Sequence, residues 1–171
     1  MPRIALLPLL LLAACGARST PRTSSTTCRP PPGSHETTFL LFQSQNQDAF
    51  HLKEVKGLTP DPACSDVRAR PFDEAAFTGE LDALHCGGAT VASFAGWRVR
   101  FYDGINGQLQ VHYVVESPQA LHILIDSTSG GMPGGAIDKQ TFAVVLPPAG
   151  KPIRECTSTT DLGSYDGPMP P

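Results

Sequence analysis

WRVRFYDGINGQLQVHYVVE, residues 97–116, holds the clearest structural pattern in the chain and decides the predicted fold. Apolar and polar side chains alternate in two runs that flank a turn, as in two antiparallel strands with one buried face. The pair Asn106-Gly107 by itself favours a two-residue turn, whereas a five-residue loop over residues 103–107 brings the apolar side chains of both runs opposite each other. The pairs in this second register are Phe101 with Leu109, Val99 with Val111, and Trp97 with Tyr113. Because a slip of one residue would turn every side chain to the other face, burial favours the second register.

The wetter face of this hairpin, together with aromatic side chains nearby, offers a candidate contact surface. In the favoured register it presents Arg98, Arg100, Gln110 and His112. Charged side chains on strands are commonly solvated edge residues, and this is the plain interpretation. With Trp97 or Tyr102 nearby, the same sheet face could instead serve as a contact surface. The candidate surface consists of Trp97, Arg98, Arg100 and Tyr102.

Other short strands are predicted on both sides of this hairpin. Residues 37–43 and 50–55 are rich in aromatic and branched side chains, and the polar letters SQNQDA between them are typical of a turn. Further strands are predicted at residues 121–125, 141–146 and 153–156. The letters DSTSGG, which begin at Asp126, are interpreted as a polar loop between strands.

One segment has the periodicity of a helix. Within residues 72–85, Phe77, Leu81 and Leu84 recur at helical spacing, and two glycines follow as a stop signal. Asp73 is placed to cap the start of this helix. The predicted fold is therefore mainly β in the α+β class, with a small antiparallel sheet or sandwich and one short helix.

The amino terminus has the pattern of an export signal. A basic start precedes an apolar run that is too short to cross a bilayer, and the letters LLAACG end in Cys15 and Gly16. This stretch resembles the lipobox of bacterial lipoproteins. The resemblance implies removal of residues 1–14, a lipid thioether on Cys15, further acylation of the new amino terminus, and attachment to a membrane. Gly16 lacks the aspartate linked to inner-membrane retention, which favours the outer membrane in a two-membrane organism. An ordinary secretory signal with cleavage nearby is the alternative.

The other four of the five cysteines predict two disulfides in an oxidising compartment. Three pairings are open. We favour Cys64 with Cys86, which closes a short loop, and Cys28 with Cys156, which joins the start of the folded body to its end. Zinc is disfavoured because the spacings are scattered and no C-x-x-C pair occurs.

Composition divides the mature chain into three parts. Residues 15–36, which include the lipidated cysteine, are rich in Ser, Thr and Pro and are predicted to form a disordered tether. Residues 37–156 are predicted to form a single β-rich domain, and residues 157–171 a disordered tail. Without Arg3 the chain keeps 12 of its 13 basic residues against 16 acidic ones, and this balance argues against nucleic acid as a partner.

No motif for catalysis, a cofactor or a metal stands out in the sequence. Ser127 and Ser129 lie in letters that superficially match a serine-protease stretch, but the chain lacks the surrounding motifs of that class. No pair of carboxylates is placed for acid and base work. We therefore predict a chain that is not an enzyme and that binds neither a cofactor nor a metal.

Two further stretches carry a family resemblance. AGWRVRF, residues 95–101, and TFAVVLPPAGKPI, residues 141–153, are similar in order and character to the C-terminal domain of PrcB-like lipoproteins, accessory subunits of a bacterial surface protease complex. Gly96 and Trp97 match the glycine and aromatic of that family's turn, while Ala95 replaces its first glycine. The resemblance implies a non-catalytic domain that docks on another exported protein.

Together these features predict a lipid-anchored envelope protein that acts as a binding or accessory domain for another exported protein. Two alternatives stay open at this point. The chain could be an envelope hydrolase of unrecognised type, or a carrier of a lipid or small hydrophobic ligand held between the layers of the sheet.

Overall fold

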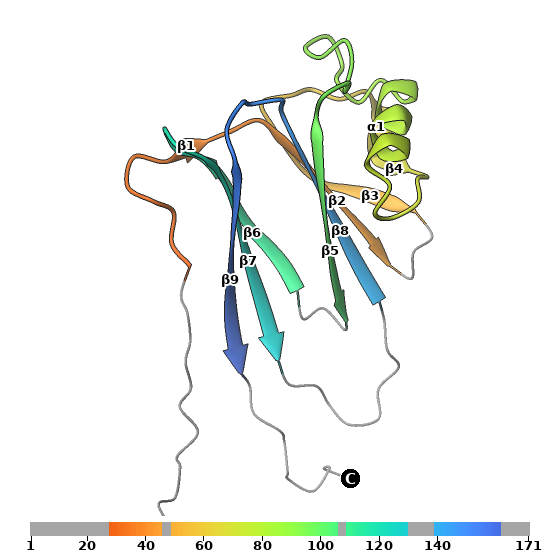
Figure 1. Ribbon diagram of the computed structural model, residues 1–171. Coiled ribbons are helices and arrows are strands. Elements are labelled where there is room, and N and C mark those ends of the chain that lie inside the picture. Colours follow the sequence, from red (N-terminus) through yellow and green to blue (C-terminus); the bar gives the residue numbers. More distant parts are fainter. Residues whose placement is uncertain (1–27, 46–48, 106–108, 130–138, 162–171) are drawn as a thin grey trace, which may run out of the picture.

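The computed structural model describes residues 28–45, 49–105, 109–129 and 139–161. Two β-sheets pack face to face, and one helix covers the outer face of the larger sheet (Figure 1). The prediction of a mainly β fold with one short helix is confirmed, and the sandwich is the form that it takes. The signal segment, Cys15, residues 16–27 of the predicted tether and residues 162–171 lie outside the described residues.

The larger sheet has five antiparallel strands in the order β4-β3-β2-β8-β5. Their bounds are β4 Asp66–Val67, β3 Phe50–Lys56, β2 Phe39–Gln45, β8 Lys139–Leu146 and β5 Arg98–Ile105. The smaller sheet has four strands in the order β1-β6-β7-β9. Their bounds are β1 His35–Glu36, β6 Leu109–Glu116, β7 Leu121–Ser129 and β9 Ile153–Asp161. Strand β9 runs parallel to β7, whereas the other pairs in this sheet are antiparallel.

The central strands β2 and β8 are buried on both faces, which explains their almost unbroken apolar sequences. Successive side chains point to opposite sides, so each strand supplies two cores. Leu40, Phe42 and Val145 enter the helix-side core, while Leu41 and Val144 enter the inter-sheet core.

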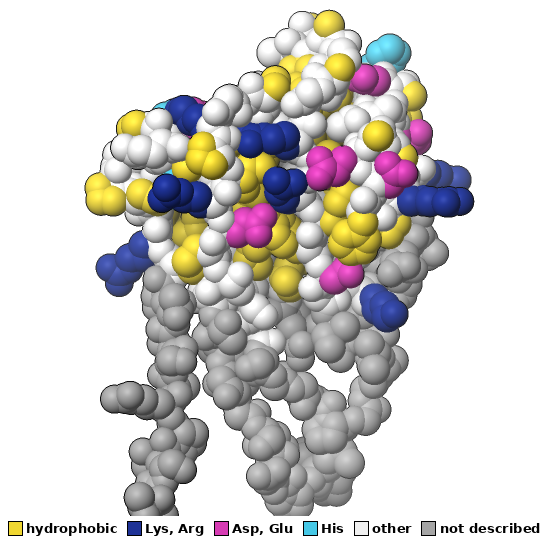
Figure 2. Space-filling model, viewed as in Figure 1, with side chains coloured by type: hydrophobic (Ala, Val, Ile, Leu, Met, Phe, Trp, Pro, Cys, Tyr) yellow, Lys and Arg dark blue, Asp and Glu magenta, His cyan; other side chains and the backbone are white. Residues whose placement is uncertain are grey.

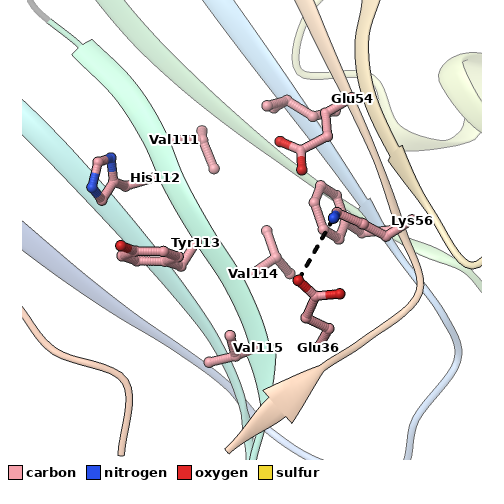
Figure 3. Close-up of a pocket in the computed structure, with 10 residues that line it drawn as sticks. Glu36, Glu54, Lys56, Val111, His112, Tyr113, Val114 and Val115 are labelled. Atoms are coloured by element: carbon pink, nitrogen blue, oxygen red, sulfur yellow. Dashed lines mark ion pairs between the residues drawn. The ribbon is translucent and has the colours of Figure 1, made fainter.

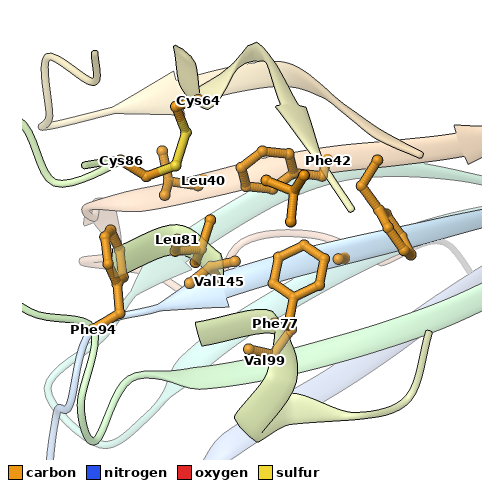
Figure 4. Close-up of a cluster of buried hydrophobic side chains, with 12 residues drawn as sticks. Leu40, Phe42, Cys64, Phe77, Leu81, Cys86, Phe94, Val99 and Val145 are labelled. Atoms are coloured by element: carbon orange, nitrogen blue, oxygen red, sulfur yellow. A yellow bond between two sulfur atoms is a disulfide. The ribbon is translucent and has the colours of Figure 1, made fainter. Parts of the chain in front are cut away.

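The helix-side core is built around aromatic rings and a disulfide (Figure 4). Phe77 of the helix contacts Phe42 edge-on, with ring centroids 5.5 Å apart. Cys64, in the short 3₁₀ helix η1 at Pro62–Ser65, is bonded to Cys86, and both cysteines are fully buried. The predicted pairing of these two cysteines is confirmed.

Helix α1 spans Glu74–Ala83 inside the predicted range. The N–H of Ala76 donates to the side chain of Asp73 at 3.0 Å, so the predicted cap is present. Phe77 and Leu81 are fully buried beneath the helix, as their spacing indicates. The apolar face of α1 is therefore what fixes it on the sheet.

The predicted hairpin over residues 97–116 is wrong, because β5 and β6 belong to different sheets. Strand β5 pairs with β8 along its whole length, and β6 pairs with β7. Val99 is buried in the helix-side core, whereas Val111 packs against the inter-sheet core. The apolar sides of the two runs thus serve different layers and never face each other in one sheet. Residues 106–108 of the connection lie outside the described residues.

Three predicted boundaries also differ from the structure. Strand β9 continues through Asp161, so residues 157–161 are paired with β7 and are not part of a disordered tail. Strand β1 lies inside the predicted tether and pairs with Val115 and Glu116. Strand β7 continues through Ser129, so the first letters of DSTSGG are strand and not loop. In each case hydrogen bonding to a distant strand orders a segment that has little apolar content of its own.

The second disulfide ties the amino-terminal segment to the smaller sheet. Cys28 is bonded to Cys156 of β9, with Cα atoms 5.8 Å apart, which confirms the second predicted pairing. Cys156 lies beside Leu124 of β7 in the parallel register, so both point to the outer face of the sheet. Leu124 is 3% exposed, and the disulfide therefore attaches the start of the described chain over a hydrophobic position.

Candidate binding groove

The four residues of the predicted contact surface do not form one surface. Trp97 packs against the helix-side core, with its ring centroid 4.9 Å from that of Phe94. Tyr102 packs on the other side of β5, against the inter-sheet core. Arg98 and Arg100 share this second side with Tyr102, because side chains alternate along a strand.

Arg98, Arg100 and Tyr102 join the two sheets along the β5 and β9 edge. The hydroxyl of Tyr102 donates to Glu155 of β9 at 2.8 Å. Arg100 lies 3.7 Å from the same carboxylate and 3.2 Å from Glu74 of α1. Arg98 donates to the carbonyl oxygen of Lys151 at 2.8 Å. Basic and acidic side chains gather over this edge of the sandwich (Figure 2), and their mutual contacts hold it closed.

Burial and the bond to Glu155 both raise the pKa of Tyr102. The phenol therefore stays protonated and remains a donor across the physiological range. This residue acts as a structural link between sheets, and its hydroxyl is occupied inside the molecule.

In the part of the chain that the structure describes, the opposite edge of the sandwich is open. Strand β1 pairs with β6 only at Val115 and Glu116, so within the described chain residues 109–114 have no strand neighbour on that side. Strand β4 pairs with β3 only at Phe50 and His51, which leaves residues 52–56 without a neighbouring strand among the described residues. Two unpaired strand edges, one from each sheet, thus lie on the same side of the molecule.

A groove runs between these two edges, and we call it the edge groove. It consists of a narrow part of about 180 Å³ and a wide part of about 350 Å³, both lined by Val111. The narrow part is also lined by Glu36, Phe39, Leu41, Glu54, Lys56 and residues 112–115. The wide part is also lined by Gln43, Lys53, Leu109, Gln110, Gln140 and Phe142. The floor is apolar and the rim is polar, which is the usual arrangement of a binding site.

A β-bulge in β6 shapes one wall of the edge groove. The pairing with β7 shifts between Val111 and Tyr113, so His112 is an extra residue in the ladder. Val111 and Val114 consequently both point toward the gap between the sheets, while His112 and Tyr113 point away from it (Figure 3). Tyr113 is 45% exposed on the outer side. Simple alternation along the sequence would have placed Val111 and Tyr113 on one face, which is why sequence reasoning missed this wall.

The two parts of the edge groove differ in charge. At the rim of the narrow part, Glu36 lies 3.6 Å from Lys56 in an ion pair, and Glu54 stands beside them (Figure 3). Around the wide part, Lys53 is the one charged side chain among its described lining residues, and three glutamines accompany it. The described lining of the wide part therefore carries a net positive charge.

A polar cluster fixes the closed end of the groove. Glu116 accepts hydrogen bonds from the ammonium group of Lys151 and from Thr37, the latter at 3.2 Å. The bond from Lys151 is the main cause of a lowered pKa at Glu116. Because Thr37 follows β1 directly, this carboxylate holds the chain where it crosses from the smaller sheet to the larger one.

The described residues include no group of three or more His, Cys, Asp and Glu side chains that could share a metal ion. Within the same ranges, no helix has the length and apolar character needed to cross a membrane. Family models, curated proteins and solved structures were compared with this chain, and none matches. The interpretation of the edge groove accordingly depends on its own geometry.

Proposed function

We propose that this chain is a lipid-anchored envelope protein that binds another exported protein through the edge groove. The letters LLAACG support the anchor, because a cysteine after small residues at the end of an apolar run is the pattern at which lipoprotein signals are cut. The PrcB-like resemblance of residues 95–101 and 141–153 supports an accessory role. In an organism with two membranes, the proposed location is the outer membrane.

The observation that carries the binding role is the asymmetry of the two sandwich edges. One edge is closed by Arg100, Tyr102 and Glu155, while the other leaves apolar side chains at the bottom of a groove. Its lining combines aliphatic, aromatic, amide and charged groups. Among these described side chains none forms a nucleophile and base pair, which favours binding over hydrolysis.

The proposed tether sets the distance over which a partner is reached. Residues 16–27 separate the lipidated cysteine from Cys28, and an extended chain of this length spans roughly 35–40 Å. The bond from Cys28 to Cys156 prevents further extension, because it attaches the chain to the smaller sheet. A partner would therefore be another envelope or surface protein within this distance of the membrane.

Crosslinking in native envelopes, followed by affinity recovery of the full chain, tests this proposal. Val111→Arg places a charge in the edge groove and is expected to lower recovery of a specific partner at least tenfold. Arg70→Glu, a change at an exposed residue before α1, is the control and should leave recovery unchanged. Equal recovery with both variants, or no specific partner with the unchanged chain, would overturn the proposal. Native mass spectrometry that finds a retained lipid would favour the carrier function instead.

A further inference from the structure

We infer that the edge groove takes an extended peptide segment of the partner as an additional β-strand beside β6. This inference rests on the proposed function and specifies its binding mode. The segment runs antiparallel to β6, carries an apolar side chain toward the floor of the narrow part, and carries an acidic side chain toward Lys53 in the wide part.

The backbone of β6 already accepts a strand at this edge. Strand β1 pairs antiparallel with it, His35 opposite Glu116 and Glu36 opposite Val115. The chain then leaves the ladder to enter β2, so within the described residues the ladder ends at Val115. An added strand would continue the same ladder in the same direction and bond the outward backbone groups of residues 109–114.

The dimensions of the site suit such a strand. Neighbouring strands lie about 4.8 Å apart, and residues 109–114 extend about 20 Å along β6. The two parts of the edge groove follow this stretch, since Leu109 and Gln110 line the wide part and Val114 lines the narrow part. Side chains of an added strand that point inward would therefore enter the groove at alternate positions.

The floor of the narrow part selects an apolar side chain. Phe39 is 4% exposed and Leu41 is 6% exposed there, and Val114 faces them from β6. An aliphatic group placed over these side chains would remove the remaining apolar surface from water. Because the added strand runs antiparallel to β6, this position comes first along the partner segment.

Charge complementarity selects the next inward position. Lys53 lies on the wall of the wide part with Gln43, Gln110 and Gln140, and no described carboxylate lines this part. An acidic side chain of the partner would pair with the ammonium group and accept hydrogen bonds from the amides. The segment thus has an apolar residue followed, two or four positions later, by Asp or Glu.

The same edge has features that disfavour pairing with an arbitrary β-strand. The bulge at His112 twists β6, and Lys53, Glu54 and Lys56 place charges along the facing edge. A flat hydrophobic strand would offer no partner to the charges of Lys53 and Glu54. A partner peptide with complementary charges pairs with them, so the bulge and the charged side chains favour one class of partner.

The test uses a phage library of random nine-residue peptides, panned on the mature full-length chain in detergent. Enriched peptides are expected to alternate apolar and polar residues and to place an acidic residue after an apolar one. On binding, those backbone amides of residues 109–114 that point toward the added strand should exchange hydrogen at least tenfold more slowly, while the amides that face β7 should change less. N-methylation of the synthetic peptide at alternate positions should weaken binding at least tenfold, while the intervening positions should tolerate it.

Charge reversal supplies the matched controls. Lys53→Glu should weaken the acidic peptide at least tenfold and recover binding when the peptide acid is replaced by lysine, whereas Arg70→Glu should have no effect. No enriched sequence, enriched peptides that leave residues 109–114 unprotected, or indifference to N-methylation would each overturn the strand-addition inference. If these strand-addition tests fail but Val111→Arg still abolishes recovery of the crosslinked partner, the proposed function stands and only the strand-addition inference is refuted.

Discussion

Tyr102 and Glu155 join the two sheets of the sandwich, since the phenol of β5 donates to the carboxylate of β9 at 2.8 Å. Arg100 approaches the same carboxylate at 3.7 Å and also reaches Glu74 of α1. One acidic side chain thus connects a strand of each sheet, and through Arg100 it is linked to the helix. This closed edge is the structural counterpart of the open edge that forms the groove.

Removing this link should weaken the sandwich without unfolding it. We expect Tyr102→Phe to lower the free energy of unfolding by about 1 kcal/mol, because one hydrogen bond to a charged acceptor is lost while the ring remains packed. Urea denaturation measures the change. Tyr113→Phe is the matched control, since Tyr113 is 45% exposed on the outer side of β6, and it should be neutral. Equal stability of the two variants would contradict the linking role.

The disulfide between Cys28 and Cys156 should contribute more to stability than its exposed position suggests. It bridges a sequence separation of 128 residues. Closing a loop of about 100 residues is worth about 4.7 kcal/mol in the chain-entropy model, and we expect replacement of both cysteines by serine to cost about 2–5 kcal/mol.

Urea denaturation of the double variant, together with limited proteolysis, measures this contribution. Residues 28–34 should become accessible to protease when the bond is absent, while the helix-side core stays protected. A loss below about 1 kcal/mol with unchanged proteolysis would show that other contacts hold the segment.

Stability should rise with pH from about 4 to 7. Burial, and then the charge of Arg154, lower the pKa of His122. The unfolded chain takes up this proton near pH 6.5 while the folded chain resists it, so stability falls as the pH drops below that value. Glu116 has a lowered pKa because of Lys151, so its contribution is present above about pH 4.3 and is lost at lower pH.

Denaturation at a series of pH values separates the two groups. His122→Gln should remove the slope below about pH 6.5 and keep the loss in acid. Lys151→Met should reduce the loss in acid and keep the slope. Identical pH profiles for the two variants and the unchanged chain would refute both assignments.

Lipidation is tested at Cys15. Cys15→Ala should abolish incorporation of labelled palmitate and leave a precursor that keeps its signal, because the modifying and cleaving steps need the thiol. Cell fractionation, metabolic labelling and intact mass measure the outcome. If the signal is instead an ordinary secretory signal, Cys15 lies in the removed segment. The mature protein then carries no acyl group, and Cys15→Ala leaves its mass unchanged.

Local patterns in the sequence were enough for helix α1 and for the longer strands, but not for β1, β4 or the carboxyl-terminal ends of β7 and β9. Helix α1 followed from the spacing of Phe77 and Leu81 and from the cap at Asp73, because these depend only on neighbours one turn away. Strands β2 and β8 followed from their apolar runs. Both disulfides were also predicted. Cys64 and Cys86 close a short loop, and Cys28 and Cys156 join the start of the folded body to its end.

The partner of each strand could not be predicted in the same way. Residues 98–105 alternate well enough for a hairpin with residues 109–116, yet β5 pairs with β8 and β6 pairs with β7. Alternation indicates which face of a strand is buried, but it does not indicate which layer of the protein that face packs against. The doubly apolar β8 offers β5 a buried neighbour, and this decides the pairing through contacts far apart in sequence.

The candidate site is likewise a product of tertiary structure. Val111, Phe39 and Lys53 meet in or beside the edge groove because β6, β2 and β3 come from two sheets and because the bulge at His112 reverses the side-chain order. The sequence by itself determined helix α1 and the longer strands, because these depend on local spacing, and it favoured the cysteine pairs that the structure contains. The lipid anchor at Cys15 stays a prediction. Only the tertiary structure decided which edges are closed and which is open, because hydrogen bonding between strands is set by long-range packing.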